Sequence, residues 1–108
     1  MEITLRAIAE PHRRDILRLV LTREMAAGDI ASHFDVSRPA ISQHLRVLVE
    51  ANLVTVRQEG TRRLYLARPE TIAAVRSYLD AFWDQSLQRL AQAAEAEERS
   101  NDVAARRN

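Results

Sequence analysis

The sequence predicts a mainly α-helical fold with one small β-hairpin, and two observations support that prediction. The 108 residues include only two Gly and three Pro, a composition that favours long helices over a loop-rich or all-β fold. Apolar residues recur at helical spacing in several stretches, whereas β-type runs occur only in residues 53–58 and 62–67. The expected order is four helices, two strands and a final helix in one domain.

The first two helices precede residue 21. Residues 2–9 predict a short helix with apolar Ile3, Leu5 and Ile8. Pro11 begins the second helix, because its missing N–H costs nothing in a first turn. The inward face of this helix comprises Ile16, Leu17, Leu19 and Val20.

A helix-turn-helix is expected next, with a helix over residues 27–34, a turn over 35–37 and a second helix over 37–51. Ser37 is a suitable N-cap, Pro39 is tolerated in the first turn, and Asn52 can end the helix in a left-handed conformation. The face predicted to be buried repeats every three or four residues and comprises Ile41, Leu45 and Leu48.

The two strands form a wing, in which Gly60 can supply the positive φ of a hairpin turn at residues 59–61. Pro69 then begins a long helix. Its apolar stripe comprises Ile72, Val75, Leu79, Phe82, Trp83, Leu87 and Leu90. We expect one domain over residues 1–94 and a polar, frayed tail over residues 95–108.

Charge is unevenly distributed along the chain, and every basic residue except His is Arg. Residues 1–68 hold eleven Arg and eight acidic residues, a net charge of +3, whereas residues 69–108 hold five Arg and seven acidic residues, a net charge of −2. The first part is therefore the candidate for a polyanionic partner. Because there is no Cys, disulfides, thiolate metal sites and thiol redox switches are excluded. The chain shows neither a signal peptide nor an apolar run long enough for a bilayer, so we expect a cytoplasmic protein with no membrane partner.

The helix over residues 37–51 matches the requirements of a DNA-recognition helix, with one apolar face and one face of short polar groups and Arg. Gln43 can read adenine, and Arg46 can read guanine or hold a phosphate. The predicted DNA-binding residues of the helix are Ser37, Arg38, Pro39, Ser42, Gln43 and Arg46, and those of the wing are Arg57, Arg62 and Arg63.

These segments resemble the ArsR/SmtB-type (arsenic-repressor) family of bacterial winged helix-turn-helix regulators. The resemblance is carried by residues 11–17, 29–31, 36–48, 51–54 and 57–66, and residues 79–83 resemble its cysteine-free branch. It implies a homodimer that binds an operator and usually represses, often at its own operon. The dimer interface that we expect comprises Ile3, Leu5, Ile8, Leu79, Phe82, Trp83, Leu87 and Leu90. The chain departs from the family pattern at Glu10, Asn52 and Arg68, where an Asp cap, a Gly and an Asn or Asp are usual.

The sequence predicts no metal site and no cofactor. The family's site on the last helix uses His and carboxylates, and this helix has Asp80 and Asp84 but no His. His12, His33 and His44 are scattered without the i, i+3 or i, i+4 spacing of a one-helix chelate, so we interpret them as ordinary polar or half-buried residues. We likewise expect a solvated helix face to hold Arg13, Arg14 and Arg18.

Other functions remain open beside the leading one. The chain could be a winged-helix protein-interaction module without DNA binding, or a repressor that senses a small apolar ligand near Phe82 and Trp83. It could also answer to a partner protein or to no effector. An enzyme is not expected, because the sequence holds no nucleophile–base pair, no glycine-rich phosphate loop and no paired-acid pocket.

Overall fold

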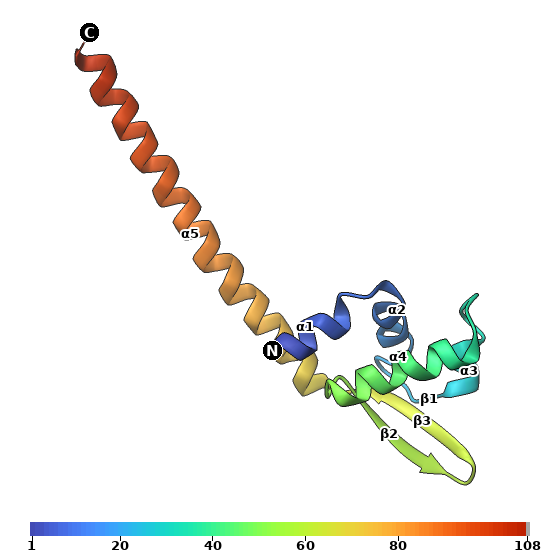
Figure 1. The fold of residues 1–108 in the computed structure, drawn as a ribbon. Coiled ribbons are helices and arrows are strands. Elements are labelled where there is room, and N and C mark those ends of the chain that lie inside the picture. Colours follow the sequence, from blue (N-terminus) through green and yellow to red (C-terminus); the bar gives the residue numbers. More distant parts are fainter. Residues whose placement is uncertain (108) are drawn as a thin grey trace. The chain divides into compact units, whose positions relative to one another are not determined.

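The computed structural model describes residues 1–107, with side chains through Asn101, and shows the expected order of helices with one additional strand (Figure 1). The chain forms two compact units, residues 1–75 and the segment from residue 76 onward. The elements are α1 (Glu2–Ile8), α2 (Pro11–Leu19), β1 (Met25–Ala26), α3 (Ala27–Ala31), α4 (Arg38–Glu50), β2 (Val54–Glu59), β3 (Arg62–Ala67) and α5 (Pro69–Arg107).

The additional strand β1 makes the wing a three-stranded antiparallel sheet in the order β1-β3-β2. Met25 pairs with Tyr65 and Ala26 with Leu64. The sequence prediction missed β1 because two residues are too few to show a period. The prediction was also wrong about the end of the third helix. Beyond Ala31 the chain tightens into three-residue turns, in which the N–H groups of residues 33 and 34 donate to the carbonyls of residues 30 and 31.

The core surrounds the inward face of α4. As predicted, Ile41, Leu45 and Leu48 are at most 1% exposed. They pack with buried residues from α2, α3, the sheet and the residues that flank these elements, which include Ile16, Val20, Ile30, Leu53, Val54 and Tyr65. Burial of one face fixes the rotation of α4 about its own axis, so the opposite face must point to solvent.

Both ends of α4 are capped as the sequence predicts. The Ser37 hydroxyl accepts a hydrogen bond from the Ala40 N–H (3.3 Å), and Pro39 lies in the first turn. Asn52 adopts φ = 62°, which lets its N–H donate to Val49 O (3.0 Å) and the Leu53 N–H donate to Leu48 O (3.0 Å). This pair of bonds is the Schellman arrangement, and it ends α4 where β2 must begin.

We expect Ser37→Ala to lower the free energy of unfolding by about 1 kcal/mol, because the Ala40 N–H loses its acceptor. Urea denaturation followed by circular dichroism measures this. Ser77→Ala, at an exposed position inside α5, is the matched control and should cause no loss. Equal stabilities of Ser37→Ala and the unchanged protein would show that the cap contributes nothing.

The hairpin of β2 and β3 is regular, with pairs running from Val54–Ala67 to Glu59–Arg62. Gly60 has φ = 62°, as predicted for its turn, and an added Cβ would meet no atom within 4 Å. The constraint on this glycine is therefore backbone conformation and not space. The tip of the wing is solvent-exposed and polar.

Helix α5 begins within the first unit, where Ile72 packs against the core and Val75 is buried. Farther along, its apolar side chains are exposed: Leu79 is 37% exposed, Phe82 50%, Trp83 57%, Leu87 56% and Leu90 66%. The helix continues past residue 94 to Arg107, and the domain boundary at residue 94 stays a prediction. Among the described residues, no helix has the length and apolar character that a membrane crossing requires.

Candidate nucleic-acid interface

The outward face of α4 carries the predicted recognition residues. All six of the positions predicted on this helix are exposed, namely Ser37, Arg38, Pro39, Ser42, Gln43 and Arg46. Gln43 and Arg46 are three residues apart and so lie on one side of the helix. The fold therefore supports the division of α4 into a packing face and a polar face.

The structure brings the polar face of α4 and the wing together. Ser42 and Arg46 line one surface hollow with Arg63 and Tyr65. Arg38 lines a second hollow with Arg62 and Arg63, beside β1 and α3. Figure 1 shows α4 and the hairpin side by side. Arg63 is the wing arginine that lines both hollows.

The three wing arginines differ in their partners. Arg57 donates to Glu24 (2.6 Å) and to Glu59 (3.1 Å), and these carboxylates raise the pKa of Arg57 above its ordinary value. Arg62 donates to Asp29 (3.4 Å). Within residues 1–101, whose side chains are described, Arg63 makes no ion pair, and neither does Arg38 or Arg46. Of the predicted arginines, these three are the ones whose charge no carboxylate of that part of the chain neutralises.

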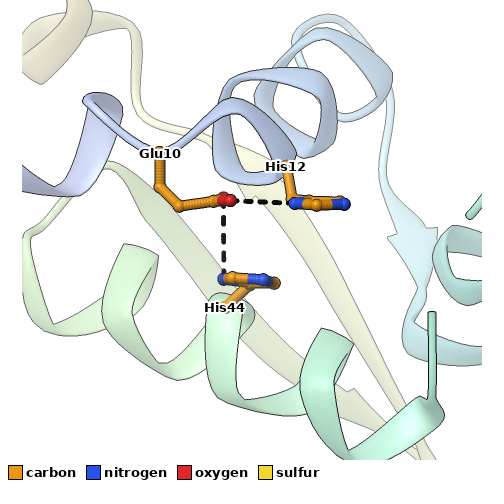
Figure 2. Close-up of side chains that lie close together, drawn as sticks. All are labelled: Glu10, His12 and His44. Carbon is orange, nitrogen blue, oxygen red and sulfur yellow. Dashed lines mark hydrogen bonds and ion pairs between the residues drawn. The ribbon is translucent and has the colours of Figure 1, made fainter.

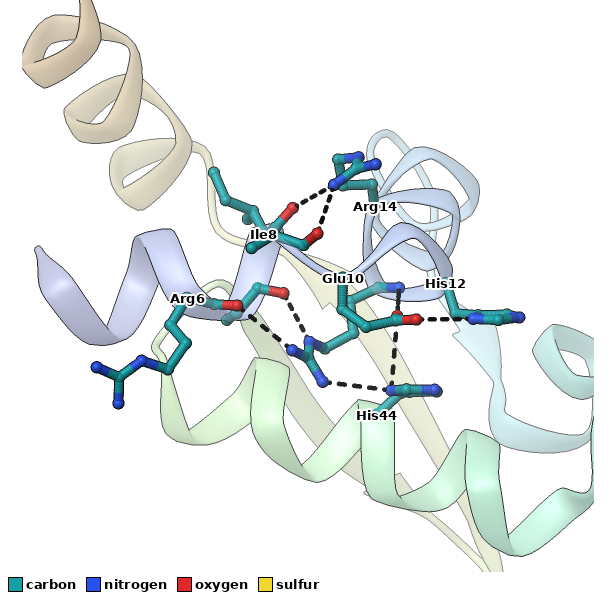
Figure 3. A network of polar contacts seen from close by, with 9 residues as sticks. Arg6, Ile8, Glu10, His12, Arg14 and His44 are labelled. Atoms are coloured by element: carbon teal, nitrogen blue, oxygen red, sulfur yellow. Dashed lines mark hydrogen bonds and ion pairs between the residues drawn. The ribbon is translucent and has the colours of Figure 1, made fainter.

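The expected solvated arginine face of α2 is wrong for Arg13, which is half-buried, whereas Arg14 is exposed as predicted. Arg13 Nε donates to Ala7 O (2.6 Å) and Arg13 Nη2 to Arg6 O (3.3 Å), while Arg14 donates to Ile8 O and Ala9 O (both 2.9 Å; Figure 3). The end of α1 exposes carbonyls that need donors, and these two side chains supply them. Arg18 is exposed and pairs with Asp15 (2.5 Å).

A cluster that the sequence analysis missed lies where α2 meets α4. Glu10 caps α2, since its Oε2 accepts from the Arg13 N–H (3.0 Å), and its Oε1 accepts from His12 Nδ1 (2.8 Å). His44, from α4, places its Nδ1 3.9 Å from Glu10 Oε2 (Figure 2). The hydrogen bond from His12 lowers the pKa of Glu10. Burial opposes this effect, and the bond from the Arg13 N–H and electrostatic interaction with His44 and His12 lower the pKa further.

The cluster was missed because its two histidines are 32 residues apart and on different helices. The only indication of the cluster in the sequence is that Glu10 and His12 are two residues apart. This spacing does not predict that His44 lies beside them. His33 is separate, exposed, and bonded through Nδ1 to Asp29 O (2.9 Å). The half-buried environment expected of a polar histidine holds for His12 and His44.

The expected dimer residues are accessible to different degrees. Ile3 is 68% exposed, Leu5 is half-buried, and Ile8 is half-buried against the core. On α5, Phe82 and Trp83 meet edge to face with ring centroids 5.6 Å apart. Assignment of these residues to a dimer interface remains a prediction.

Comparison with known proteins identifies the family. Residues 10–56 match the family model described as bacterial regulatory protein, arsR family. The HTH-type transcriptional regulator Rv2034 of Mycobacterium tuberculosis is 44% identical over 91 residues, which cover 84% of this chain and 85% of that protein. The chain belongs to the arsR family. The predicted family, the winged helix-turn-helix fold and the role of a DNA-binding transcriptional regulator are thereby confirmed.

Two further relatives of this arsR-family regulator bear on how it works. The transcriptional repressor SdpR of Bacillus subtilis is 43% identical over 60 residues, which cover 56% of this chain and 67% of that protein. The solution structure of a homodimeric winged helix-turn-helix DNA-binding domain from Mycobacterium bovis has a TM-score of 0.63 and 29% identity, covering 77% of each chain.

Proposed function

We propose that this arsR-family regulator is a cytoplasmic homodimeric repressor that binds an inverted-repeat operator through residues 37–51 and the wing residues 57–63. The observation that carries the proposal is the hollow shared by Ser42 and Arg46 of α4 and Arg63 of β3. A recognition helix and a basic wing on one surface can contact a groove and the adjacent phosphates of the same DNA segment. The proposal is one of binding and includes no catalytic step.

Within this surface the residues have different roles. Gln43 pairs with adenine and Arg46 with guanine, since both side chains can make bidentate contacts to base edges. Arg38 and Arg63 contact phosphates, and Ser37, Pro39 and Ser42 place the beginning of α4 against the backbone. Arg57 and Arg62 must break their ion pairs with Glu24 and Asp29 before they can contact DNA. We therefore assign these two arginines a smaller contribution to DNA affinity.

A homodimer is supported by the exposed apolar stripe on α5 and by the homodimeric relative from Mycobacterium bovis. Exposure of an uninterrupted series of large apolar side chains to water is unfavourable. Contact with a second protomer related by a two-fold axis would bury this apolar surface. A two-fold axis would place two α4 helices about 34 Å apart, one turn of DNA, and would favour an inverted repeat. We assign Ile3, Leu5 and Ile8 to the same interface.

Repression follows if the operator overlaps a promoter, because a bound dimer then excludes the polymerase. The name of SdpR as a repressor supports this direction of control. We propose the promoter of the regulator's own operon as the first operator to test.

The affinity for this DNA should fall steeply with salt, because each neutralised phosphate releases counterions. With Arg38 and Arg63 contacting phosphates in both protomers, a plot of log affinity against log salt should have a slope of about −4. A mobility-shift titration from low to high salt measures it, and Arg63→Ala should reduce the slope by about 2. Absence of binding, or binding insensitive to salt, would reject operator binding and favour a protein-interaction module.

A further inference from the structure

We propose that Glu10, His12 and His44 form a binding site for a divalent transition-metal ion of the Zn²⁺ class. One ligand atom from each residue can be chosen so that all three lie within 4.8 Å of one another. Three ligands on a tetrahedral Zn²⁺ lie about 3.4 Å apart, since Zn–N and Zn–O bonds are about 2.1 Å. Closing the site therefore requires the ligand atoms to approach one another and one imidazole to rotate, because an ion lies in the plane of each ring that binds it. A set of two imidazoles and one carboxylate is a known zinc donor set that leaves a fourth position for water.

Both imidazoles lie beside the Glu10 carboxylate. The His12 and His44 rings are nearly parallel, with an interplanar angle of 10° and centroids 5.5 Å apart. In both, Nδ1 is the nitrogen nearest to Glu10, as Figure 2 shows. The bond from the Arg13 N–H to Oε2 holds the carboxylate in place, which is the kind of outer support that metal-binding carboxylates receive.

The hydrogen-bond partners of the two imidazoles differ. Arg13 Nη1 lies 3.4 Å from His44 Nδ1, and a guanidinium can only donate. An ion bound to His44 Nδ1 would replace this contact. His12 Nδ1 instead donates to Glu10, and a bound ion would take the place of that proton. The positive charge of Arg13 would repel a bound cation. Arg13 Nε and Nη2 donate to carbonyls of α1, and these bonds can stay. Binding of the ion would break only the contact of Arg13 Nη1 with His44.

The site is accessible but not freely solvated. The side chains of Glu10, His12 and His44 are 30%, 42% and 20% exposed, and Phe34 lies beside His12 with ring centroids 6.1 Å apart. This position is distinct from the site on the last helix considered for the family, because its ligands come from the start of α2 and the middle of α4. An ion there would cross-link the recognition helix to α2.

The test is calorimetric titration of Zn²⁺ into the untagged full chain at pH 7.5, with Co²⁺ absorption as a second readout. We expect one Zn²⁺ per chain with a Kd in the micromolar range or tighter, and a tetrahedral Co²⁺ spectrum. His12→Gln, Glu10→Gln and His44→Gln should each weaken binding at least tenfold. Glu10→Gln keeps an oxygen for the α2 cap, and the half-buried His12 lies outside the hydrophobic core, so these two variants should remain folded.

His33→Gln is the matched control, because it removes a histidine outside the cluster, and it should bind Zn²⁺ like the unchanged protein. The proposal is overturned if the unchanged chain binds no Zn²⁺ at millimolar concentration, or if His12→Gln, with an unchanged circular dichroism spectrum, binds it with full affinity. The measurement involves no DNA, so its failure leaves the operator proposal intact, and failure of operator binding leaves this one intact.

Discussion

Trp83→Asp should convert the dimer to a monomer at micromolar concentration. Trp83 lies at the middle of the exposed stripe of α5. A two-fold interface would bury one Trp83 side chain from each protomer. Removal of two buried aromatic side chains, each contributing about 2–3 kcal/mol, predicts a dimer Kd raised at least 100-fold. Light scattering coupled to size-exclusion chromatography measures the mass, and operator affinity should fall with it, because a monomer binds one half-site.

Gln88→Asp is the matched control for this substitution. It places the same charge on the same helix, five residues later and therefore on the far side from Trp83. We expect an unchanged dimer mass. If Trp83→Asp also keeps the dimer mass, the interface does not include this face of α5.

Arg46→Ala and Gln43→Ala should each weaken operator binding by about 1–3 kcal/mol, or about 5- to 150-fold, because each removes a side chain that pairs with a base edge. Binding to random DNA should change much less, since it rests on phosphate contacts. Because both protomers carry the substitution, the effect on the full operator should exceed that on a half-site. Fluorescence anisotropy with an operator duplex and a shuffled duplex, at one salt concentration, separates the two quantities.

Arg18→Ala controls for the removal of one positive charge. Arg18 is exposed and paired with Asp15, and it lines an apolar hollow that shares no residue with the two hollows of the interface. It should leave both affinities unchanged. Equal reductions on operator and shuffled DNA for Arg46→Ala would assign Arg46 to a phosphate and remove it from base reading.

Local rules account for much of this fold. The cap at Ser37, the left-handed Asn52 and the turn at Gly60 each follow from one residue and its immediate neighbours, so the sequence alone predicts them. Strand β1 is different, because only its pairing with β3 makes two residues a strand.

Some features of the candidate site likewise follow from local sequence, and others depend on tertiary contacts. The exposed face of α4 follows from helical period, but the ion pairs of Arg57 with Glu24 and of Arg62 with Asp29 each join residues 33 positions apart. The bonds of Arg13 to the end of α1 and the meeting of His12 with His44 likewise depend on how helices pack. Interactions of this kind need tertiary structure, and no periodicity in the sequence reports them.

Strand β1 gives the wing a mechanical role. It leads directly into α3 and is hydrogen-bonded to β3, the strand that carries Arg63. A tilt of the hairpin is therefore transmitted through the backbone to the first helix of the helix-turn-helix. The wing is thus joined to the helix-turn-helix by main-chain hydrogen bonds as well as by the side chains that line the shared hollows.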